Sequence, residues 1–396
     1  MPWKESRVMD ERTRFCQLVT EGDLTITELC QSFGISRATG HKWLGRYEAG
    51  GVAALADQSR ARHTQPDAYP KRIRNMVIHA RAKHPTWGAK KIRPWLEKRH
   101  PQTDFPSLTT IETILRDVGL VRPQRRSRRF DGAMGSRSTT DHPNGIWSVD
   151  FKGQFRLGDG SYCYPLTILD SHSRYLLTCD ALKSTEFELT KAAFHRLFSE
   201  RGLPDRILSD NGSPFTACGY GRVSRLSAYW MTLGIEVERT RPGSPQDNGR
   251  HERMHRTLKE ETARPPTNTK RGQQRRFNAF RRTYNEERPH EALDMKCPSE
   301  VYERSSRPYE EVVYEYPGHW EVRKVSTIGQ ISWKNRLYFL SEALIGHHVG
   351  LVEIDDGAWK VSFRQLPLAK LVNRKNGVRI ESLLPLRKKN KCKPCA

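Results

Sequence analysis

The sequence predicts a multidomain chain, with all-α helix-turn-helix modules, then a central α/β domain with a mixed sheet, and last a small β-barrel. Three observations predict it. Apolar residues at helical spacing dominate up to about residue 120, strands and helices alternate from about 143, and only short strands follow about 318. The expected bounds are 1–60 and 61–121 for two modules, 122–142 for a linker, 143–306 for the α/β domain, 315–380 for the barrel and 381–396 for a basic tail.

The composition indicates a polyanionic partner. The 396 residues include 68 Lys and Arg against 45 Asp and Glu, a net charge of +23. Clustered positive charge of this size favours DNA or RNA as the partner, and a basic surface kept for solubility is the alternative. No apolar run could span a membrane and no signal peptide is evident, so we expect no membrane partner and a cytoplasmic protein.

The eight cysteines are scattered and predict no disulfide framework. Cys392 and Cys395 form a CxxC pair in a lysine-rich tail with no second ligand pair nearby. A disordered basic tail is therefore the prediction and a zinc site the alternative.

Residues 10–50 are predicted to form a helix-turn-helix. Gly34 falls between two helical patterns, where a tight turn needs a positive φ, and Ser36 suits the N-cap of the second helix. A plain three-helix bundle is the alternative. The second helix would present four residues to a major groove: Arg37, Thr39, His41 and Lys42.

A second module of the same kind is predicted at about 68–120. Its segment 89–99 carries apolar residues at helical spacing, and a further helix is expected to open at Ser107 or Thr109. The linker that follows is rich in Arg, Gly and Ser. It is compatible both with a solvated linker and with phosphate contacts by four arginines: Arg125, Arg126, Arg128 and Arg129.

The α/β region begins with three antiparallel strands, 146–151, 162–170 and 173–182, separated by turn signals. Thr185 and Glu188 predict a capping box for a helix through about Arg201. A short strand at 206–209, a helix at about 222–233, a strand at 235–240 and a helix at about 272–285 follow. In the last region, Asp356 and Gly357 are a hairpin signal within a predicted barrel of the SH3-like type.

Three acidic residues stand in unlike contexts. Asp150 lies within the apolar strand IWSVDF, Asp210 follows the strand RILS, and Glu252 stands at the start of a predicted helix. A carboxylate inside an apolar strand is costly unless a cation meets it. In so basic a chain, the three acids favour a divalent metal site that acts on nucleic acid. Asp247 is the alternative third ligand, and purely structural carboxylates are the alternative to a metal site.

The segments VDFKG, SDNGSPF and PGSPQDNGRHERMHRTLK resemble the three motifs of DDE transposases with a retroviral-integrase-type catalytic core. The resemblance is strong over about 143–305, and the order of the flanking domains matches insertion-sequence transposases. It implies an RNase H-like core with Asp150, Asp210 and Glu252 as catalytic and metal-binding acids. Two departures stand out: the zinc-binding His/Cys module of retroviral integrases is absent, and 41 residues separate Asp210 from Glu252, with the extra ones expected in a surface loop within 216–225.

The resemblance also implies the chemistry. Two Mg²⁺ ions, replaceable by Mn²⁺, would serve an in-line phosphodiester displacement without a covalent protein–DNA intermediate. Water would cut the transposon end, and the freed 3′-OH would attack target DNA. The implied partners are double-stranded DNA, as transposon ends and as target, and further copies of the chain in a multimer on paired ends. The resemblance also implies a prokaryotic, nucleoid-associated protein without a small-molecule substrate.

Further DNA contacts are predicted beside the acids. On the helix of Glu252, the cationic positions at +3, +4 and +7 share its face, and a solvated face with ion pairs is the alternative. Lys152 shares the strand face of Asp150. The predicted contacts are Lys152, Gln246, Asn248, His255, Arg256 and Lys259.

The predicted function is that of a DNA transposase that cleaves transposon ends and transfers the 3′-OH strand into target DNA. One alternative is a catalytically inactive, sequence-specific DNA-binding regulator with the same fold. The other is a DNA endonuclease without strand transfer.

Overall fold

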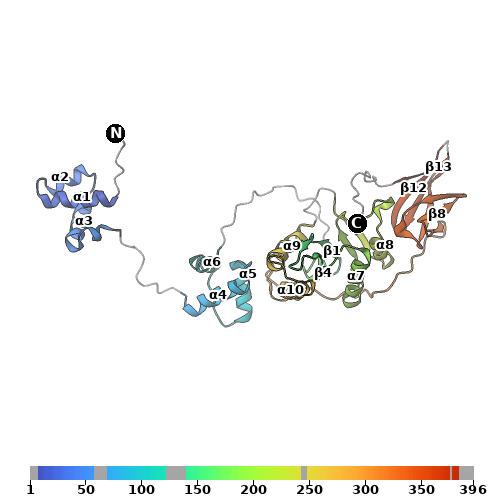
Figure 1. The fold of residues 1–396 in the computed structure, drawn as a ribbon, viewed down its shortest axis with the longest axis horizontal. Coiled ribbons are helices and arrows are strands. Elements are labelled where there is room, and N and C mark those ends of the chain that lie inside the picture. The colour runs from blue at the N-terminus through green and yellow to red at the C-terminus, as the bar shows by residue number, and fades with distance from the viewer. Residues whose placement is uncertain (1–7, 58–68, 122–139, 242–247, 375–376, 383–396) are drawn as a thin grey trace. The chain divides into compact units, whose positions relative to one another are not determined.

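A computed structural model describes residues 8–57, 69–121, 140–241, 248–374 and 377–382. The chain divides into two compact units, residues 1–68 and 69–396 (Figure 1). The linker arginines Arg125, Arg126, Arg128 and Arg129 lie outside the described residues, as do Cys392 and Cys395 of the tail. No helix in the described ranges is both long and apolar enough to cross a membrane.

The first unit is a three-helix module. It contains α1 (Val8–Glu21), α2 (Ile26–Ser32), α3 (Arg37–Gly50) and the short 3₁₀ turn η1 (Val52–Leu55). Gly34 has a φ of 62° between α2 and α3, and the Oγ of Ser36 accepts from the backbone N–H of Thr39 at 3.2 Å. The predicted turn and N-cap are therefore confirmed. The core consists of Phe15, Cys16, Leu29, Cys30, Trp43 and Leu55.

The second unit opens with another three-helix module, α4 (Lys71–Lys83), α5 (Ala89–Arg99) and α6 (Leu108–Asp117). Ser107 is the N-cap of α6, since its Oγ accepts from the N–H of Thr110 at 3.3 Å. Ile92, Trp95 and Leu96 are buried as their spacing predicted. The two modules therefore repeat one helical architecture.

This second module contacts the α/β domain through acidic partners. Glu287, at the end of the π-helical turn η4 (Thr283–Glu287), accepts from Lys83 at 3.3 Å, from Trp95 at 3.3 Å and from Arg99 at 3.0 Å. The hydroxyl of Thr86 donates to Glu261 at 2.5 Å. Cationic residues of α4 and α5 therefore face carboxylates of the same chain.

The α/β domain is built on a mixed sheet in the order β2-β3-β1-β5-β6, with β4 paired to β3. Its strands are β1 (Ile146–Phe151), β2 (Phe155–Arg156), β3 (Tyr162–Asp170), β4 (Leu176–Leu182), β5 (Arg206–Ser209) and β6 (Glu236–Arg239). The first three long strands pair antiparallel, as predicted, whereas β5 joins β1 in parallel and β6 joins β5 in parallel. The mixed sheet predicted from the sequence is therefore present.

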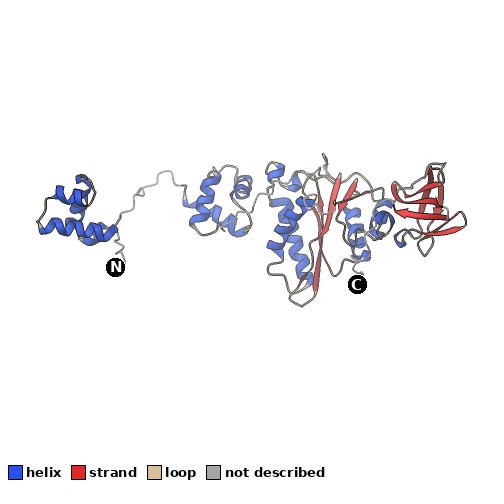
Figure 2. Cartoon of the chain, turned by 90° about the horizontal axis from the view of Figure 1, so that it is seen from above, coloured by secondary structure: helices blue, strands red, loops and turns tan. Residues whose placement is uncertain are grey.

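Helices cover both faces of this sheet (Figure 2). One face packs on α7 (Phe187–Arg201) and α8 (Arg225–Thr232), and the other on α9 (Gly249–Thr262) and α10 (Lys270–Arg282). Trp147 and Val149 of β1 face α7 and α8. Because side chains alternate along a strand, Ser148 and Asp150 face the opposite side, toward α9.

The predicted capping box at Thr185 is wrong. The N-cap of α7 is Glu186, which makes no side-chain capping bond. Glu188 instead approaches Arg225 at 3.3 Å, so its carboxylate is engaged with a cation of α8. Glu188 therefore makes an exposed ion pair with a residue distant in sequence and no local capping bond.

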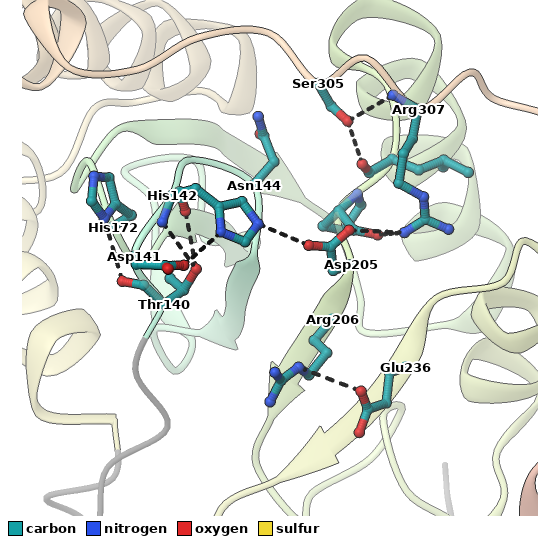
Figure 3. Close-up of polar contacts among 12 residues, drawn as sticks. Thr140, Asp141, His142, Asn144, His172, Asp205, Arg206, Glu236, Ser305 and Arg307 are labelled. Carbon is teal, nitrogen blue, oxygen red and sulfur yellow. Dashed lines mark hydrogen bonds and ion pairs between the residues drawn. The ribbon is translucent and has the colours of Figure 1, made fainter.

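Polar contacts fix the entry to β1 (Figure 3). His142 Nε2 lies 3.0 Å from Asp205, and the amide of Asn144 donates to the carbonyl of Glu303 at 2.8 Å. Ser305 Oγ donates to the carbonyl of Leu203 at 2.6 Å. These bonds join the start of β1 to the loop before β5 and to residues 303–305, so the two central parallel strands start from one anchored corner.

The last region consists of two antiparallel sheets around one core. Five strands pair in the order β13-β12-β11-β10-β7, and β8 pairs with β9. Asp356 and Gly357 connect β10 to β11, as the hairpin signal predicted. The strands are β7 (Glu321–Lys324), β8 (Gln330–Trp333), β9 (Arg336–Phe339), β10 (His348–Asp355), β11 (Ala358–Phe363), β12 (Leu366–Arg374) and β13 (Gly377–Ser382).

The segment in which extra residues were expected is packed, not a free surface loop. It forms the 3₁₀ turn η2 (Tyr220–Arg222), and Thr216 bridges to Val223. Val223 is fully buried in the core of the β-sheet region, and Tyr220 packs against that core. The insertion therefore connects the α/β domain to the barrel.

Candidate active site

Two of the three predicted acids lie at neighbouring strand ends. In the parallel pairing of β1 with β5, Val149 is opposite Ser209, and Asp150 and Asp210 are the next residue on each strand. Parallel strands lie about 4.8 Å apart, and paired positions share a face. The backbone thus brings the carboxylates of Asp150 and Asp210 together.

The pKa of Asp150 is affected by both of the other predicted acids. Burial, then the charge of Asp210, and to a smaller degree that of Glu252, raise the pKa of Asp150 to about 7, although the Phe151 N–H and Lys152 oppose the rise. The Asp150 side chain remains 23% exposed, so ligands can reach it. Burial and the neighbouring carboxylates therefore disfavour the charge of Asp150 at the carboxyl ends of the central strands β1 and β5.

Asp210 is oriented by its own loop. Its Oδ1 accepts from the N–H of Gly212 at 3.0 Å, and the amide of Asn211 donates to the carbonyl of Thr240 at 2.7 Å. The loop after β5 thereby orients the Asp210 side chain at the strand end, and Asn211 ties this loop to Thr240, the residue that follows β6.

Glu252 lies in the first turn of α9, where its side chain is exposed. Two histidines lie on the buried side of this helix. Sequence reasoning missed the first of them, His251, and assigned the second, His255, to the DNA contacts. His251 and His255 are buried, and their rings contact each other edge to face at 4.6 Å. His255 Nδ1 lies 3.6 Å from Asp150 Oδ2.

The burial of His255 leaves it almost no surface for the DNA contact predicted for it. Only 3% of the residue is exposed, and its Nε2 lies 2.6 Å from Thr167 Oγ1. Burial, helped by the charges of His251 and Lys152, lowers the pKa of His255 far below its usual range. The ring is therefore neutral, and its contact with Asp150 is not an ion pair. The signal was in the sequence, because His251, Met254, His255 and Leu258 form the buried helical stripe.

The remaining cations of this site stay accessible. Arg256 and Lys259 are exposed on α9, on the face that carries Glu252. Lys152 and Lys259 together line a small cavity of about 120 Å³ beside β1 and α9. The structure therefore brings together two cations that the sequence assigned to different motifs. Asn248 precedes α9 and uses no side-chain bond to cap it.

The residue types suit a hard divalent cation. Mg²⁺ prefers a few carboxylate oxygens together with water and substrate phosphate. Within the described ranges, no three His, Cys, Asp or Glu side chains already stand close enough to hold a metal ion together. This differs from the mutual charge effect on Asp150, but repulsion between carboxylates acts over a longer distance than ligation. Carboxylates without a cation between them repel one another, and a bound cation would draw them together.

The predicted contacts of the first module fall on α3. Arg37, His41 and Lys42 are exposed, whereas the hydroxyl of Thr39 lies 2.9 Å from Ser36 Oγ in the N-cap. Three of the four side chains are thus accessible on one helix. Gln246 and the alternative ligand Asp247 lie outside the described residues.

Family models match both halves of this arrangement. Two models described as integrase core domain match residues 140–245 and 233–298. A helix-turn-helix domain matches residues 11–63, and a homeodomain-like domain matches residues 39–115.

Curated relatives include insertion-element and viral proteins. An uncharacterized 31.7 kDa protein of insertion element IS407 from Burkholderia multivorans is 28% identical over 48% of this chain and 67% of its own length. An uncharacterized 39.2 kDa protein of insertion element IS476 from Xanthomonas euvesicatoria is 23% identical over 67% of this chain and 75% of its own length. The Gag-Pol polyprotein of avian reticuloendotheliosis virus is 26% identical, but the match spans only 20% of that polyprotein.

Among solved structures, a simian T-cell lymphotropic virus intasome in complex with PP2A regulatory subunit B56 gamma aligns over 74% of this chain and 98% of that one, with 15% identity and a TM-score of 0.36. The HTLV-2 integrase catalytic core domain in complex with magnesium aligns over 41% of this chain and 97% of that one, with 16% identity and a TM-score of 0.30. By sequence, residues 140–298 thus match the integrase core domain and the residues before them match helix-turn-helix domains, and relatives from two insertion elements agree with the resemblance that the motifs predicted.

Proposed function

We propose that this protein is a DNA transposase that cleaves transposon ends in a Mg²⁺-dependent reaction and transfers the 3′-OH strand into target DNA. One observation carries the proposal: Asp150 and Asp210 follow paired positions on neighbouring parallel strands, and Glu252 is close enough to raise the pKa of Asp150 further. Three acids thus influence one another beside the carboxyl ends of β1 and β5, in a chain whose net charge is +23.

In this proposal Asp150, Asp210 and Glu252 hold the cation. When bound, two Mg²⁺ ions activate the attacking oxygen and stabilise the leaving oxygen of an in-line displacement. The protein residues contribute oxygen ligands and their placement, and the nucleophiles are water and then the freed 3′-OH. No side chain is required to attack phosphorus, so no covalent protein–DNA intermediate is expected.

The cations beside the acids are proposed to hold the DNA backbone. Lys152 and Lys259 line one cavity, and Arg256 is exposed on the same helix. Their charges favour a phosphate next to the carboxylates, which would otherwise repel it. Gln246 and Asn248, which precede α9, are proposed as further contacts.

The two helical modules are proposed to recognise the transposon ends. Arg37, His41 and Lys42 on α3 are the exposed candidates for base or phosphate contacts. The proposed partners are double-stranded transposon ends and target DNA, and the active species is proposed to be a multimer of this chain on paired ends.

The test is incubation of the full-length protein with candidate end duplexes and Mg²⁺, with cleavage and joining read on one denaturing gel. Asp150→Asn, Asp210→Asn and Glu252→Gln keep the size of each side chain and remove its charge, so each is expected to abolish cleavage while DNA binding persists. Glu260→Gln on α9 and Asp180→Asn on β4 are matched controls, because these acids lie outside the proposed site. Full cleavage by any of the three site variants would refute the assignment.

The same gel separates the two alternatives. An endonuclease would release cut ends and yield no joined product at any Mg²⁺ concentration. A regulator without turnover would bind the ends and leave them intact.

A further inference from the structure

A buried hydrogen-bonded chain lies beneath Asp150. Thr167 Oγ1 is 2.6 Å from His255 Nε2 and 2.7 Å from His251 Nε2, and His251 Nδ1 is 2.9 Å from Ser148 Oγ. His255 Nδ1 faces Asp150 Oδ2 at 3.6 Å. Four side chains from two strands and one helix are thus joined by hydrogen bonds, and the Asp150 carboxylate lies 3.6 Å from the last ring, in contact with it but beyond hydrogen-bond distance.

The fold explains why these residues meet. Thr167 on β3 is the direct cross-strand partner of Asp150 on β1, and Ser148 shares the strand face of Asp150. His251 and His255 are four residues apart on α9, so both rings point from one side of the helix onto that face. The chain therefore joins the strand of Asp150 to the helix that carries Glu252.

Thr167 is the centre of these contacts. Its hydroxyl lies within hydrogen-bond distance of both imidazole rings and also donates to the main-chain carbonyl of Asp150 at 3.1 Å. The hydroxyl of Ser148 likewise donates to the carbonyl of Leu169 at 3.3 Å. The two hydroxyls therefore connect α9 to both strands of the β1–β3 pair.

We propose that His255 and Thr167 are positioning residues, which orient the Asp150 carboxylate and hold α9 against β1 so that Asp150 and Glu252 can serve the same cation. This inference rests on the proposed function, because positioning Asp150 and Glu252 matters for the reaction only if these acids bind the metal ion. His255 contacts Asp150 and Thr167 holds the His255 ring in place, and in this proposal neither residue touches the DNA or performs the chemistry.

Two substitutions of His255 distinguish orientation from simple packing. In His255→Asn the amide Nδ2 takes the place of Nδ1 and still faces Asp150, whereas in His255→Gln the amide takes the place of Nε2 and faces Thr167. Loss of a group that orients a metal ligand weakens metal affinity roughly 10- to 100-fold. We therefore expect that loss for His255→Gln and an affinity within about 3-fold of wild type for His255→Asn.

Thr167→Val is the second probe, because it removes the hydroxyl and keeps the branched shape. Its matched control is Thr190→Val on α7, since both threonines are fully buried and Thr190 donates to a main-chain carbonyl outside the site. We expect roughly 10-fold weaker metal binding for Thr167→Val and no change for Thr190→Val.

The experiment titrates Mn²⁺ into each full-length variant by calorimetry, with thermal unfolding recorded in parallel. A second series measures the Mg²⁺ concentration that gives half-maximal cleavage of an end duplex. The proposal is supported if His255→Gln and Thr167→Val weaken Mn²⁺ binding and raise the Mg²⁺ requirement while their melting temperatures match the controls.

Equal Mn²⁺ affinity for His255→Asn and His255→Gln would overturn the proposal, as would wild-type affinity in Thr167→Val. The proposed function fails separately, if the wild-type protein leaves every end duplex intact at all Mg²⁺ concentrations. In that case the Mn²⁺ titration still decides whether the buried chain positions the acids.

Discussion

Replacing Glu287 with alanine should loosen the second helical module from the α/β domain. One carboxylate oxygen of Glu287 accepts from Lys83, Trp95 and Arg99, which all belong to α4 and α5. Burial of Glu287 disfavours its charge, but these hydrogen bonds and charges outweigh burial and lower its pKa. The substitution would leave two cations and an indole N–H without their acceptor.

The size of the effect follows from the burial of the group. Removing one partner of a fully buried ion pair costs about 3–5 kcal/mol. The Glu287 side chain keeps 24% of its surface exposed, so solvent screens the interaction, and we expect about 2 kcal/mol. That loss corresponds to roughly 30-fold faster opening of the amides that the contact protects.

Hydrogen exchange of peptides from α4 and α5, followed by mass spectrometry, measures this opening. Glu286→Ala is the matched control, because Glu286 is the exposed neighbour in the same π-helical turn. Its exchange should match wild type, since exposed substitutions usually change stability by less than about 0.5 kcal/mol. Unchanged exchange in Glu287→Ala, or equal acceleration in both variants, would refute the docking role.

Three further outcomes are expected. Burial lowers the pKa of His84 to about 4, below its unfolded value of 6.5, so the stability that neutral His84 provides is complete above pH 6.5 and falls as the pH drops toward 4, by at most about 3 kcal/mol. Urea unfolding across that pH range should show a flatter profile for His84→Phe, which keeps the stack on Trp87. Gly221 has a φ of 62°, and an added Cβ would lie 2.7 Å from Leu368 Cδ2. Gly221→Val should therefore lower the free energy of unfolding by about 2–3 kcal/mol, measured by thermal unfolding. Gly219→Ala, whose Cβ would meet its nearest neighbour at 3.6 Å, should cost little. Arg37→Ala or Lys42→Ala should lower DNA affinity and reduce the salt slope of binding by about 1 if the residue contacts phosphate, and an unchanged slope and affinity would exclude that residue from the interface.

The sequence predicted the elements of the site better than the contacts between them. The strands of Asp150 and Asp210 are short apolar runs, so their type and ends were accessible from the pattern. Their parallel pairing depends on a crossover through β3, β4 and α7, and no local signal encodes that register. The family resemblance implied that Asp150 and Asp210 share one site, and the structure gives the strand register that places them next to each other.

Errors arose where a distant partner competed with a local pattern. The sequence pattern predicted that Glu188 forms a capping box with Thr185. In the structure the Glu188 carboxylate pairs with Arg225 of another helix. The helical spacing placed His255 on the exposed face of Glu252. A residue three positions along a helix, however, lies between that face and the buried stripe, and His255 belongs to the buried side. The extra residues before α8 were predicted to form a surface loop, but Val223 packs into the apolar core of the C-terminal sheets.

The contacts of α9 also decide how end recognition should be tested by truncation. At its start, His251 and His255 tie the helix to β1 and β3, and near its end Glu261 accepts from Thr86 of the second module. A rise of 1.5 Å per residue puts Glu261 about 14 Å from Glu252 along one continuous helix. Loss of the second module would therefore strip a partner from the helix that carries a proposed metal ligand.

Removal of residues 1–68 takes away the first module alone, and the division of the chain at that point leaves the second unit intact. We expect this truncation to lose end preference and to keep metal-dependent cleavage, whereas removal of residues 1–121 should impair both, because Glu261 and Glu287 then lose the residues that they contact. Cleavage of matched specific and random duplexes by the two truncations makes the comparison. Equal chemistry in both truncations would show that the second module contributes recognition alone, and that the contacts on α9 do not reach Glu252.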